Sequence, residues 1–219
     1  MVTFKLTKIV NINMNTLLHI EASPRTERSH SRKLGLEYAA SWQAAHPGSR
    51  VVTHDLVSEP PPFVSEAWAS AAHNDPAKRS PGERAAIAVS DHYIDELLAA
   101  DELVISTPIY NLSLPASLKA WIDQIIRFGR TFGRSAKGFE GLVKGKKVTV
   151  IVASGSDFRP GTPGGAYNHL EPYLRAILGF VGITDVRFVY AHSLNEEGPQ
   201  REQAIAEASH TLKQFATAA

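Results

Sequence analysis

Three polar stretches of this sequence come directly after apolar runs, and they hold many of the side chains that could bind a ligand. Their sequences are SPRTERSHS (23–31), TPIYNL (107–112) and SGSDFRPGTPGG (154–165). Their hydroxyl, imidazole and amide side chains donate and accept hydrogen bonds. Their glycines let the backbone approach a ligand closely. These residue types indicate binding of a ligand through both side chains and backbone.

The first stretch favours binding of a phosphate group. Residues 29–31, Ser-His-Ser, lie at or just inside the expected start of a helix, where backbone N–H groups lack partners and the helix dipole is positive. A phosphate fits such a place, and Arg25, Arg28 or Arg32 could neutralise part of its charge. The alternative is structural: one of the serines only caps the helix, and the histidine faces solvent.

The second stretch favours a flat, largely apolar ring with polar atoms at its edge. Such a ring needs backbone along its edge, apolar side chains on its face and amide donors at its rim. Residues 108–112 supply all of these, and Asn111 offers both donors and acceptors. The alternative is that Tyr110 and Leu112 fill the core while Asn111 makes a turn.

The third stretch combines small residues with three glycines. Residues 154–157, Ser-Gly-Ser-Asp, precede Gly161, Gly164 and Gly165. Backbone free of side chains could lie against a ligand here. A flexible surface loop would have the same composition.

Motifs that are missing narrow the chemistry further. The chain has no cysteine, no G-x-G-x-x-G after a strand and no G-x-x-x-x-G-K-[ST] phosphate loop. It also lacks the G-x-S-x-G and H-E-x-x-H motifs, and its nine histidines are scattered, so we expect no metal site. Binding of a phosphate and a ring without these motifs favours a mononucleotide cofactor whose ring carries the chemistry.

Alternating strands and helices must position the three stretches. The expected strands are 16–22, 49–56, 102–107, 146–154 and 184–191. The expected helices are 28–46, 81–101, 114–128, 171–182 and 198–216. Nearly continuous apolar strands require a sheet covered on both faces. We therefore predict an α/β fold of flavodoxin-like type, with a five-stranded parallel sheet in the order 2-1-3-4-5 and helices on both faces.

The polar stretches would then share one edge of the sheet, because they follow its first, third and fourth strands. Two further segments, 57–80 and 129–145, are long for connections in a compact domain. Both contain aromatic side chains, which a merely solvated loop does not need. We expect these segments to pack against a ligand or another subunit.

Length and composition set the remaining limits. The chain has 219 residues, of which 43% are hydrophobic, and a net charge of +1. We expect a loose extension over residues 1–13 and a single domain over residues 14–219. The charge argues against nucleic acid or a membrane surface as partner. No signal-peptide pattern or membrane-spanning run is present, so we expect a cytoplasmic protein.

The chain resembles the FMN-dependent NADH-azoreductases, which are flavodoxin-like quinone and azo reductases. The matching segments are SPRTERSHSRKLG (23–35), TPIYNLSLPASLKAWIDQIIRFGRTF (107–132), GFEGLVKGKKV (138–148) and PYLRAILGFVGITDVRFVYA (172–191). The resemblance implies tightly but non-covalently bound FMN at the interface of a homodimer. It also implies hydride transfer from NADH or NADPH, through the flavin, to quinones and azo compounds by a ping-pong mechanism. No side chain is expected to be catalytic.

The resemblance also implies a set of site residues. The phosphate would be held by Ser23, Ser29, His30 and Ser31, and the ring would be lined by Pro108, Ile109, Tyr110, Asn111 and Leu112. The ring would be covered by Ser154, Gly155, Ser156 and Asp157, and substrates would stack against Phe128, Phe132 and Phe180. The family commonly has Ser-Arg-Gly-Gly at positions 154–157, so Asp157 places a carboxylate where a glycine is usual.

The main alternative is a flavodoxin-type electron carrier without a small-molecule substrate of its own. Such carriers are typically acidic, whereas this chain has a net charge of +1. They also lack long connections with aromatic side chains. A second alternative is a scaffolding protein of the same fold that binds no flavin.

Overall fold

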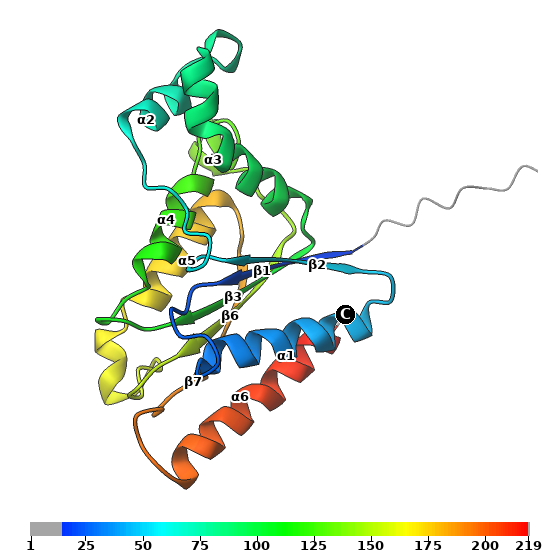
Figure 1. Ribbon diagram of the computed structural model, residues 1–219, viewed down its shortest axis with the longest axis vertical. Coiled ribbons are helices and arrows are strands. Elements are labelled where there is room, and N and C mark those ends of the chain that lie inside the picture. The colour runs from blue at the N-terminus through cyan, green and yellow to red at the C-terminus, as the bar shows by residue number, and fades with distance from the viewer. Residues whose placement is uncertain (1–14, 219) are drawn as a thin grey trace, which may run out of the picture.

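The computed structural model describes residues 15–218, and within them a five-stranded parallel sheet forms the centre (Figure 1). Its order is β2-β1-β3-β6-β7, which confirms the predicted 2-1-3-4-5 arrangement. The strands are β1 (Thr16–Glu21), β2 (Arg50–Asp55), β3 (Glu102–Pro108), β6 (Lys147–Ala153) and β7 (Asp185–Ala191). The expected extension over residues 1–13 lies outside the described residues.

Helices cover both faces of the sheet. They are α1 (His30–Ala45), α2 (Glu66–His73), α3 (Pro81–Ala99), α4 (Ala116–Ile125), α5 (Leu170–Val181) and α6 (Pro199–Thr217). Helices α1 and α6 lie on one face, and α3, α4 and α5 lie on the other (Figure 1). Every helix expected from the sequence is present, with its ends shifted by a few residues at most. No helix in residues 15–218 combines the length and apolar character needed to cross a bilayer.

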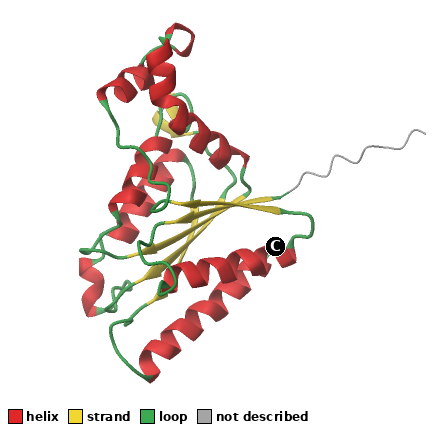
Figure 2. Cartoon of the chain, in the orientation of Figure 1, coloured by secondary structure: helices red, strands yellow, loops and turns green. Residues whose placement is uncertain are grey.

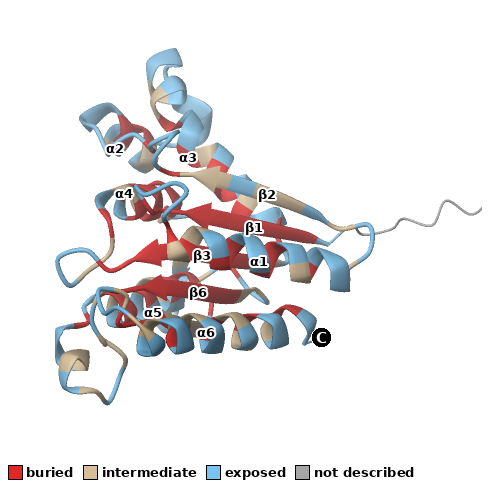
Figure 3. Ribbon diagram, turned by 60° about the horizontal axis from the view of Figure 1, so that its bottom comes forward, coloured by how far each residue is buried: buried red, intermediate tan, exposed pale blue. Residues whose placement is uncertain are grey.

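Burial decides where the chain can present polar groups. All six residues of β1 are buried, and so are all residues of β3 and β6 except the first of each (Figure 3). The edge strand β2 is only partly covered. The loops that follow the strands gather at the carboxyl edge of the sheet (Figure 2). The loops at this edge can therefore carry ligand-binding groups that the buried strands cannot.

The segment 57–80 contains α2 and a short 3-10 helix, η1 (Pro76–Lys78), which the sequence analysis did not predict. Helix α2 packs against α3, and Trp68 is buried between them, close to Ile87. The indole Nε1 of Trp68 donates to Gln124 Oε1 at 2.8 Å. Trp68 is therefore packed within the chain, although it also lines a cavity of about 640 Å³, whereas Phe63 is 79% exposed.

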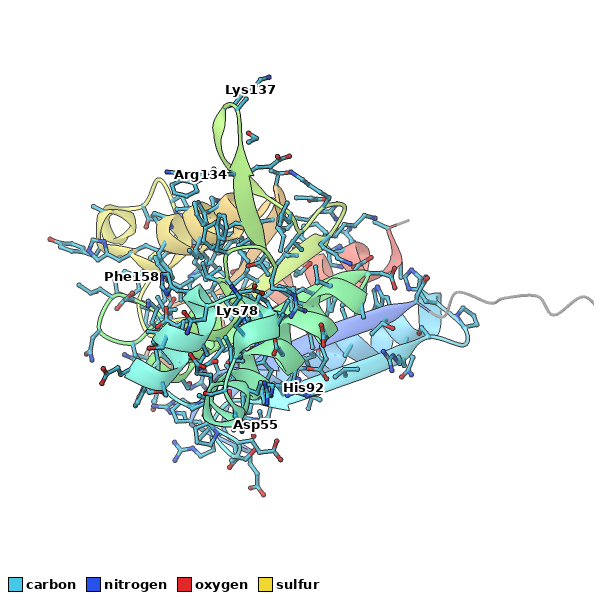
Figure 4. All side chains as sticks on the ribbon, turned by 90° about the horizontal axis from the view of Figure 1, so that it is seen from above. Asp55, Lys78, His92, Arg134, Lys137 and Phe158 are labelled. Atoms are coloured by element: carbon cyan, nitrogen blue, oxygen red, sulfur yellow. The ribbon has the colours of Figure 1, made fainter. Side chains whose placement is uncertain are left out.

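The segment 129–145 forms a hairpin instead of a loop. Its strands, β4 (Phe132–Ser135) and β5 (Gly138–Gly141), pair antiparallel. The hairpin projects from the body of the molecule with Lys137 at its tip (Figure 4). Its base is held close to the end of α5, because a Cβ on Gly141 would lie 2.2 Å from the Gly182 nitrogen.

Helix α1 approaches the sheet closely at Gly35. There, His19 Nε2 of β1 and Ser106 Oγ of β3 share a hydrogen bond of 2.9 Å. A Cβ on Gly35 would lie 2.1 Å from that serine oxygen and 2.6 Å from the histidine nitrogen. Burial, and to a lesser degree the charge of Arg32, lower the pKa of His19 to about 4, so the histidine is neutral at pH 7.

This contact predicts opposite effects for two helical glycines. Gly35→Ala should lower the free energy of unfolding by about 1–3 kcal/mol, because the methyl group forces the His19–Ser106 pair apart. Gly179→Ala in α5 is the matched control, since nothing lies within 4 Å of its Cβ position. The control should be neutral or stabilise by up to about 1 kcal/mol. Urea unfolding of both variants measures this, and equal stabilities would contradict the close approach.

Candidate functional site

The start of α1 forms the polar end of the site. Ser29 is the N-cap residue, and its Oγ accepts a hydrogen bond from the Arg32 backbone N–H at 3.2 Å. Its Oγ also lies 3.2 Å from Ser31 Oγ. Ser29 therefore caps the helix, and it also lines the cavity at the helix start. The cap uses the Arg32 N–H, so the N–H groups before it can donate to a ligand at the carboxyl edge of the sheet.

A cavity of about 280 Å³ opens at this helix start. It is lined by the predicted residues Ser23, Ser29, His30, Ser31, Pro108, Ile109, Tyr110, Ser154 and Gly155, together with Arg25, Arg28, Ala153, Leu194 and Asn195. The structure thus brings the stretches after β1, β3 and β6 together, as the sequence predicted. The loop after β7 joins them.

The charge around this cavity suits an anion. Among the described residues, no carboxylate side chain lines it, whereas Arg25 and Arg28 do. The pKa of His30 is lowered, first by burial and then by the positive charges of Lys33, Arg201 and Arg25. A phosphate would meet backbone donors, hydroxyls and positive charge in one place.

Arg32 does not face this cavity, so the suggestion that it helps to neutralise a phosphate is wrong. Its guanidinium binds Glu21 Oε2 at 2.5 Å and Asp55 Oδ1 at 2.6 Å. It also donates to the Ser23 carbonyl oxygen from Nε at 3.1 Å and from Nη2 at 2.8 Å. Arg32 therefore ties α1 to the ends of β1 and β2 and fixes the backbone of the first polar loop.

The two carboxylates respond differently to Arg32. Hydrogen bonding from Arg32 lowers the pKa of Asp55, so this group is ionised at pH 7. Burial raises the pKa of Glu21, although the Arg32 charge opposes this effect. Removing the cation would leave both carboxylates poorly compensated in a largely buried place.

A second, larger cavity of about 850 Å³ lies beside the turn after β3. Its lining is Ala22, Pro24, Val57, Tyr110, Asn111, Ser113, Leu114, Pro115, Ala116, Ser117, Lys119, His169 and Tyr173. Tyr110 lines both cavities, so they adjoin. The smaller cavity offers mostly hydroxyls and positive charge, and the larger cavity offers mainly apolar side chains with a few polar groups.

The turn itself adopts an uncommon backbone. Asn111 and Leu112 have φ values of 48° and 68°, in the left-handed region that side chains other than Asn and Asp rarely adopt. Two backbone hydrogen bonds between Tyr110 and Ser113 close the turn, and the Leu112 carbonyl accepts from the His169 N–H at 2.9 Å. The turn thereby presents Asn111 to the larger cavity. Leu112 lines neither cavity.

Only part of the third stretch faces the site. Ser154 and Gly155 line the smaller cavity, whereas Ser156 and Asp157 line neither. Asp157 binds Arg159, with Oδ1 2.9 Å from Nε and Oδ2 2.7 Å from Nη2. Its charge is thus compensated within the loop, and hydrogen bonding from Arg159 lowers its pKa.

The glycines of this stretch serve the loop itself. A Cβ on Gly164 would lie 2.3 Å from the Asp157 carbonyl oxygen, and one on Gly165 would lie 2.5 Å from the Arg159 carbonyl oxygen. These glycines therefore let the loop fold tightly on itself. We expected them to let the backbone approach a ligand, but their missing side chains are needed for packing within the loop.

The aromatic residues predicted for substrate stacking form a separate cluster. The rings of Phe132 and Phe180 lie 4.7 Å apart, and Phe128 and Phe139 pack edge-on against Phe132. Phe128, Phe132 and Phe139 line a different cavity of about 640 Å³. Within one chain, therefore, the stacking residues do not meet the two cavities at the carboxyl edge.

Sequence reasoning missed the loop after β7. Asn195 lines the smaller cavity and packs on Gly155, where a Cβ would lie 2.3 Å from Asn195 Nδ2. The rule that all parallel strands end at one edge could have pointed to this loop. In the larger cavity, His169 and Tyr173 were also missed. His169 lies between η2 (Pro163–Tyr167) and α5, and Tyr173 lies in α5. No sequence pattern places these elements beside the turn after β3.

The Arg32 contacts predict a specific loss of stability. Arg32→Met should lower the free energy of unfolding by about 3 kcal/mol, because it leaves two partly buried carboxylates without their cation. Arg28→Met is the matched control, since Arg28 belongs to the same segment and is exposed. The control should change stability by less than about 0.5 kcal/mol. Urea titrations at pH 7 decide the matter, and an equal effect of the two substitutions would contradict the role of Arg32.

Comparisons with known proteins agree with this architecture. The family described as having a flavodoxin-like fold matches residues 15–216. An FMN-dependent NADH:quinone oxidoreductase of Nostoc punctiforme is 50% identical over 200 residues, covering 91% of this chain and 97% of that protein. An FMN-dependent NAD(P)H:quinone oxidoreductase 1 of Pseudomonas aeruginosa is 41% identical, covering 94% and 100%.

A solved structure gives the same answer. The azoreductase from Bacillus anthracis strain Sterne has a TM-score of 0.85 to this chain at 29% identity, and the match covers 93% of this chain and 99% of the other. Since both the sequence and the fold match over nearly the full length, the chain belongs to the flavodoxin-like family that contains the FMN-dependent NADH:quinone oxidoreductases and the azoreductases.

Proposed function

We propose that this chain is an oxidoreductase that transfers hydride from NADH or NADPH, through bound FMN, to quinones and azo compounds by a ping-pong mechanism. The names of its relatives support the cofactor, the nicotinamide donor and the quinone acceptor. The observation that carries the proposal is the junction of a polar, positively charged cavity with a larger apolar one at Tyr110. FMN has a phosphate at one end and a flat ring at the other, which matches this arrangement.

The residues present fit the cofactor. The phosphate would be held at the start of α1 by Ser23, Ser29, His30 and Ser31, beside the positive charges of Arg25 and Arg28. Of the turn 108–112, Tyr110 and Asn111 line the larger cavity and would contact the ring, with the amide of Asn111 at its polar edge. Ser154 and Gly155 would contact the cofactor near the same turn, because they line the smaller cavity together with Tyr110.

The chain's own contribution is positioning. When bound, FMN supplies the chemistry by accepting a hydride from the nicotinamide and passing two electrons to the acceptor. Arg32 fixes the backbone of Ser23, and the closed turn fixes Asn111, so the donors stand in place before a ligand arrives. Hydride transfer needs no acid or base side chain, and the mainly apolar lining of the larger cavity would reduce contact between water and a bound ring.

We further propose that the active form is a homodimer in which each site is completed by the second chain. Phe139 on the hairpin is 62% exposed, and Phe128 and Phe63 are exposed as well. Such side chains bury well at an interface. A second chain could also bring its stacking aromatics to the ring cavity, which one chain does not do. Sedimentation velocity tests this proposal, and a monomer at all concentrations would contradict it.

Rapid kinetics test the mechanism. Anaerobic mixing of the FMN-loaded protein with NADH or NADPH should bleach the flavin absorbance, and a quinone added afterwards should restore it. Initial rates at varied donor and acceptor concentrations should give parallel double-reciprocal plots, because the two substrates use the same space in turn. Failure of both nicotinamides to bleach the flavin would contradict the proposal. Accumulation of a one-electron flavin signal would favour an electron carrier instead.

Asn111 offers a direct test of the ring site. Asn111→Gly keeps the left-handed backbone accessible but removes the amide, so FMN affinity should fall about tenfold, the value of one lost hydrogen bond. Asn111→Leu should weaken FMN at least as much and also cost stability, since leucine is strained at this φ. Flavin fluorescence titration of the apoprotein and urea unfolding measure the two effects. Unchanged affinity in the glycine variant would contradict the assigned role of the amide.

A further inference from the structure

Two histidines and a glutamate meet at the edge of the sheet, away from the flavin site. His54 belongs to β2, whereas His92 and Glu96 lie one turn apart on α3, and His92 extends toward the end of β2 (Figure 4). His54 Nε2 lies 2.5 Å from Glu96 Oε2, and His92 Nε2 lies 3.5 Å from Glu96 Oε1. One ligand atom from each of the three side chains lies within 4.8 Å of the others.

The fold brings these side chains together for a simple reason. Side chains alternate along a strand, so Val52 and His54 of β2 point to the same face of the sheet. That face is covered by α3, because Val52 packs in the core cluster that includes Ile94 and Leu97. On α3, His92 and Glu96 are four residues apart and share one helix face. The edge position of β2 leaves the group accessible from outside.

Two of the three groups are held in place. The ring of Tyr93 packs edge-on against His54 with a centroid distance of 5.1 Å. The side chains of His54 and Glu96 are only 15% and 22% exposed, whereas that of His92 is 61% exposed. Two ligands are therefore oriented in advance, and the third borders solvent, which could supply water as a further ligand.

The local charge favours a cation. Among residues 15–218, the carboxylate of Glu96 has hydrogen bonds or ion pairs only with the two histidines, so no lysine or arginine occupies it. A cation placed between these groups would meet negative charge and two imidazole nitrogens.

We propose that His54, His92 and Glu96 bind one divalent transition-metal ion, of which Zn²⁺ is the best match. Two imidazoles and one carboxylate form a donor set that suits Zn²⁺ and not Mg²⁺, which prefers oxygen ligands. Binding replaces the contact between His54 and Glu96 with two bonds to the ion and thereby links β2 to α3. None of the three residues lines the cavities at the start of α1 or at Tyr110, so the ion would stabilise the sheet edge without entering the flavin reaction.

Calorimetric titration of tag-free, FMN-loaded protein with Zn²⁺ tests the site. We expect one ion per chain, a rise in the thermal midpoint on adding Zn²⁺, and no comparable binding of Mg²⁺. His92→Ala should weaken Zn²⁺ binding at least tenfold, and because this residue is exposed the variant should fold normally. His210→Ala on α6 is the matched control, since it removes another exposed histidine, and its affinity for Zn²⁺ should match that of the unmodified chain.

Co²⁺ provides a second readout. Binding should produce visible absorption bands of a cobalt ion with nitrogen ligands, and Glu96→Gln and His92→Ala should both abolish or shift these bands. Absence of Zn²⁺ binding, or equal binding by the His92→Ala variant, would overturn the proposal and leave the group as an ion-pair cluster. The flavin spectrum recorded in parallel separates this outcome from failure of the proposed function, which would show as lost FMN.

Discussion

Burial of both faces of the central strands is the constraint on which the site depends. Strands β1, β3 and β6 are covered by α1 and α6 on one side and by α3, α4 and α5 on the other. Side chains on these strands must therefore be apolar or have partners inside, as His19 has in Ser106. Polar groups that serve a ligand are left to the strand ends. Since the strands are parallel, all of these ends meet at one edge.

At that edge, some charged side chains hold the loops in place, and others line the cavity where a ligand could bind. Arg32 lies in the same segment as Arg25 and Arg28, yet its guanidinium is turned inward to Glu21, Asp55 and the Ser23 carbonyl. The exposed arginines remain beside the cavity. Asp157 is likewise compensated by Arg159, so a carboxylate in the third loop does not add an unpaired negative charge near the polar cavity. The polar cavity keeps its positive character in this way.

The left-handed turn after β3 also fixes a side chain in place before a ligand binds. Asn111 and Leu112 hold unfavourable backbone angles, and the hydrogen bonds of Tyr110, Ser113 and His169 maintain them. Strain that persists in this manner is common where a side chain must be aimed at a ligand. The edge cluster of His54, His92 and Glu96 differs from this turn, because its members are held by packing and by one another, outside the two cavities at the carboxyl edge.

The sequence alone determined the periodic features of this protein. Apolar runs and helical spacing are local properties, so they specified the strands and helices without reference to distant residues, although the helix expected from residue 28 begins at His30. The sheet order followed from the usual arrangement of five alternating parallel strands. The residues after β1, β3 and β6 followed from the rule for parallel sheets. Only the tertiary structure decided which distant side chains meet: Arg32 with Asp55, Gly155 with Asn195, and His54 with Glu96. Such pairs depend on how far each helix slides and turns over the sheet, and that is settled by packing among elements far apart in the chain.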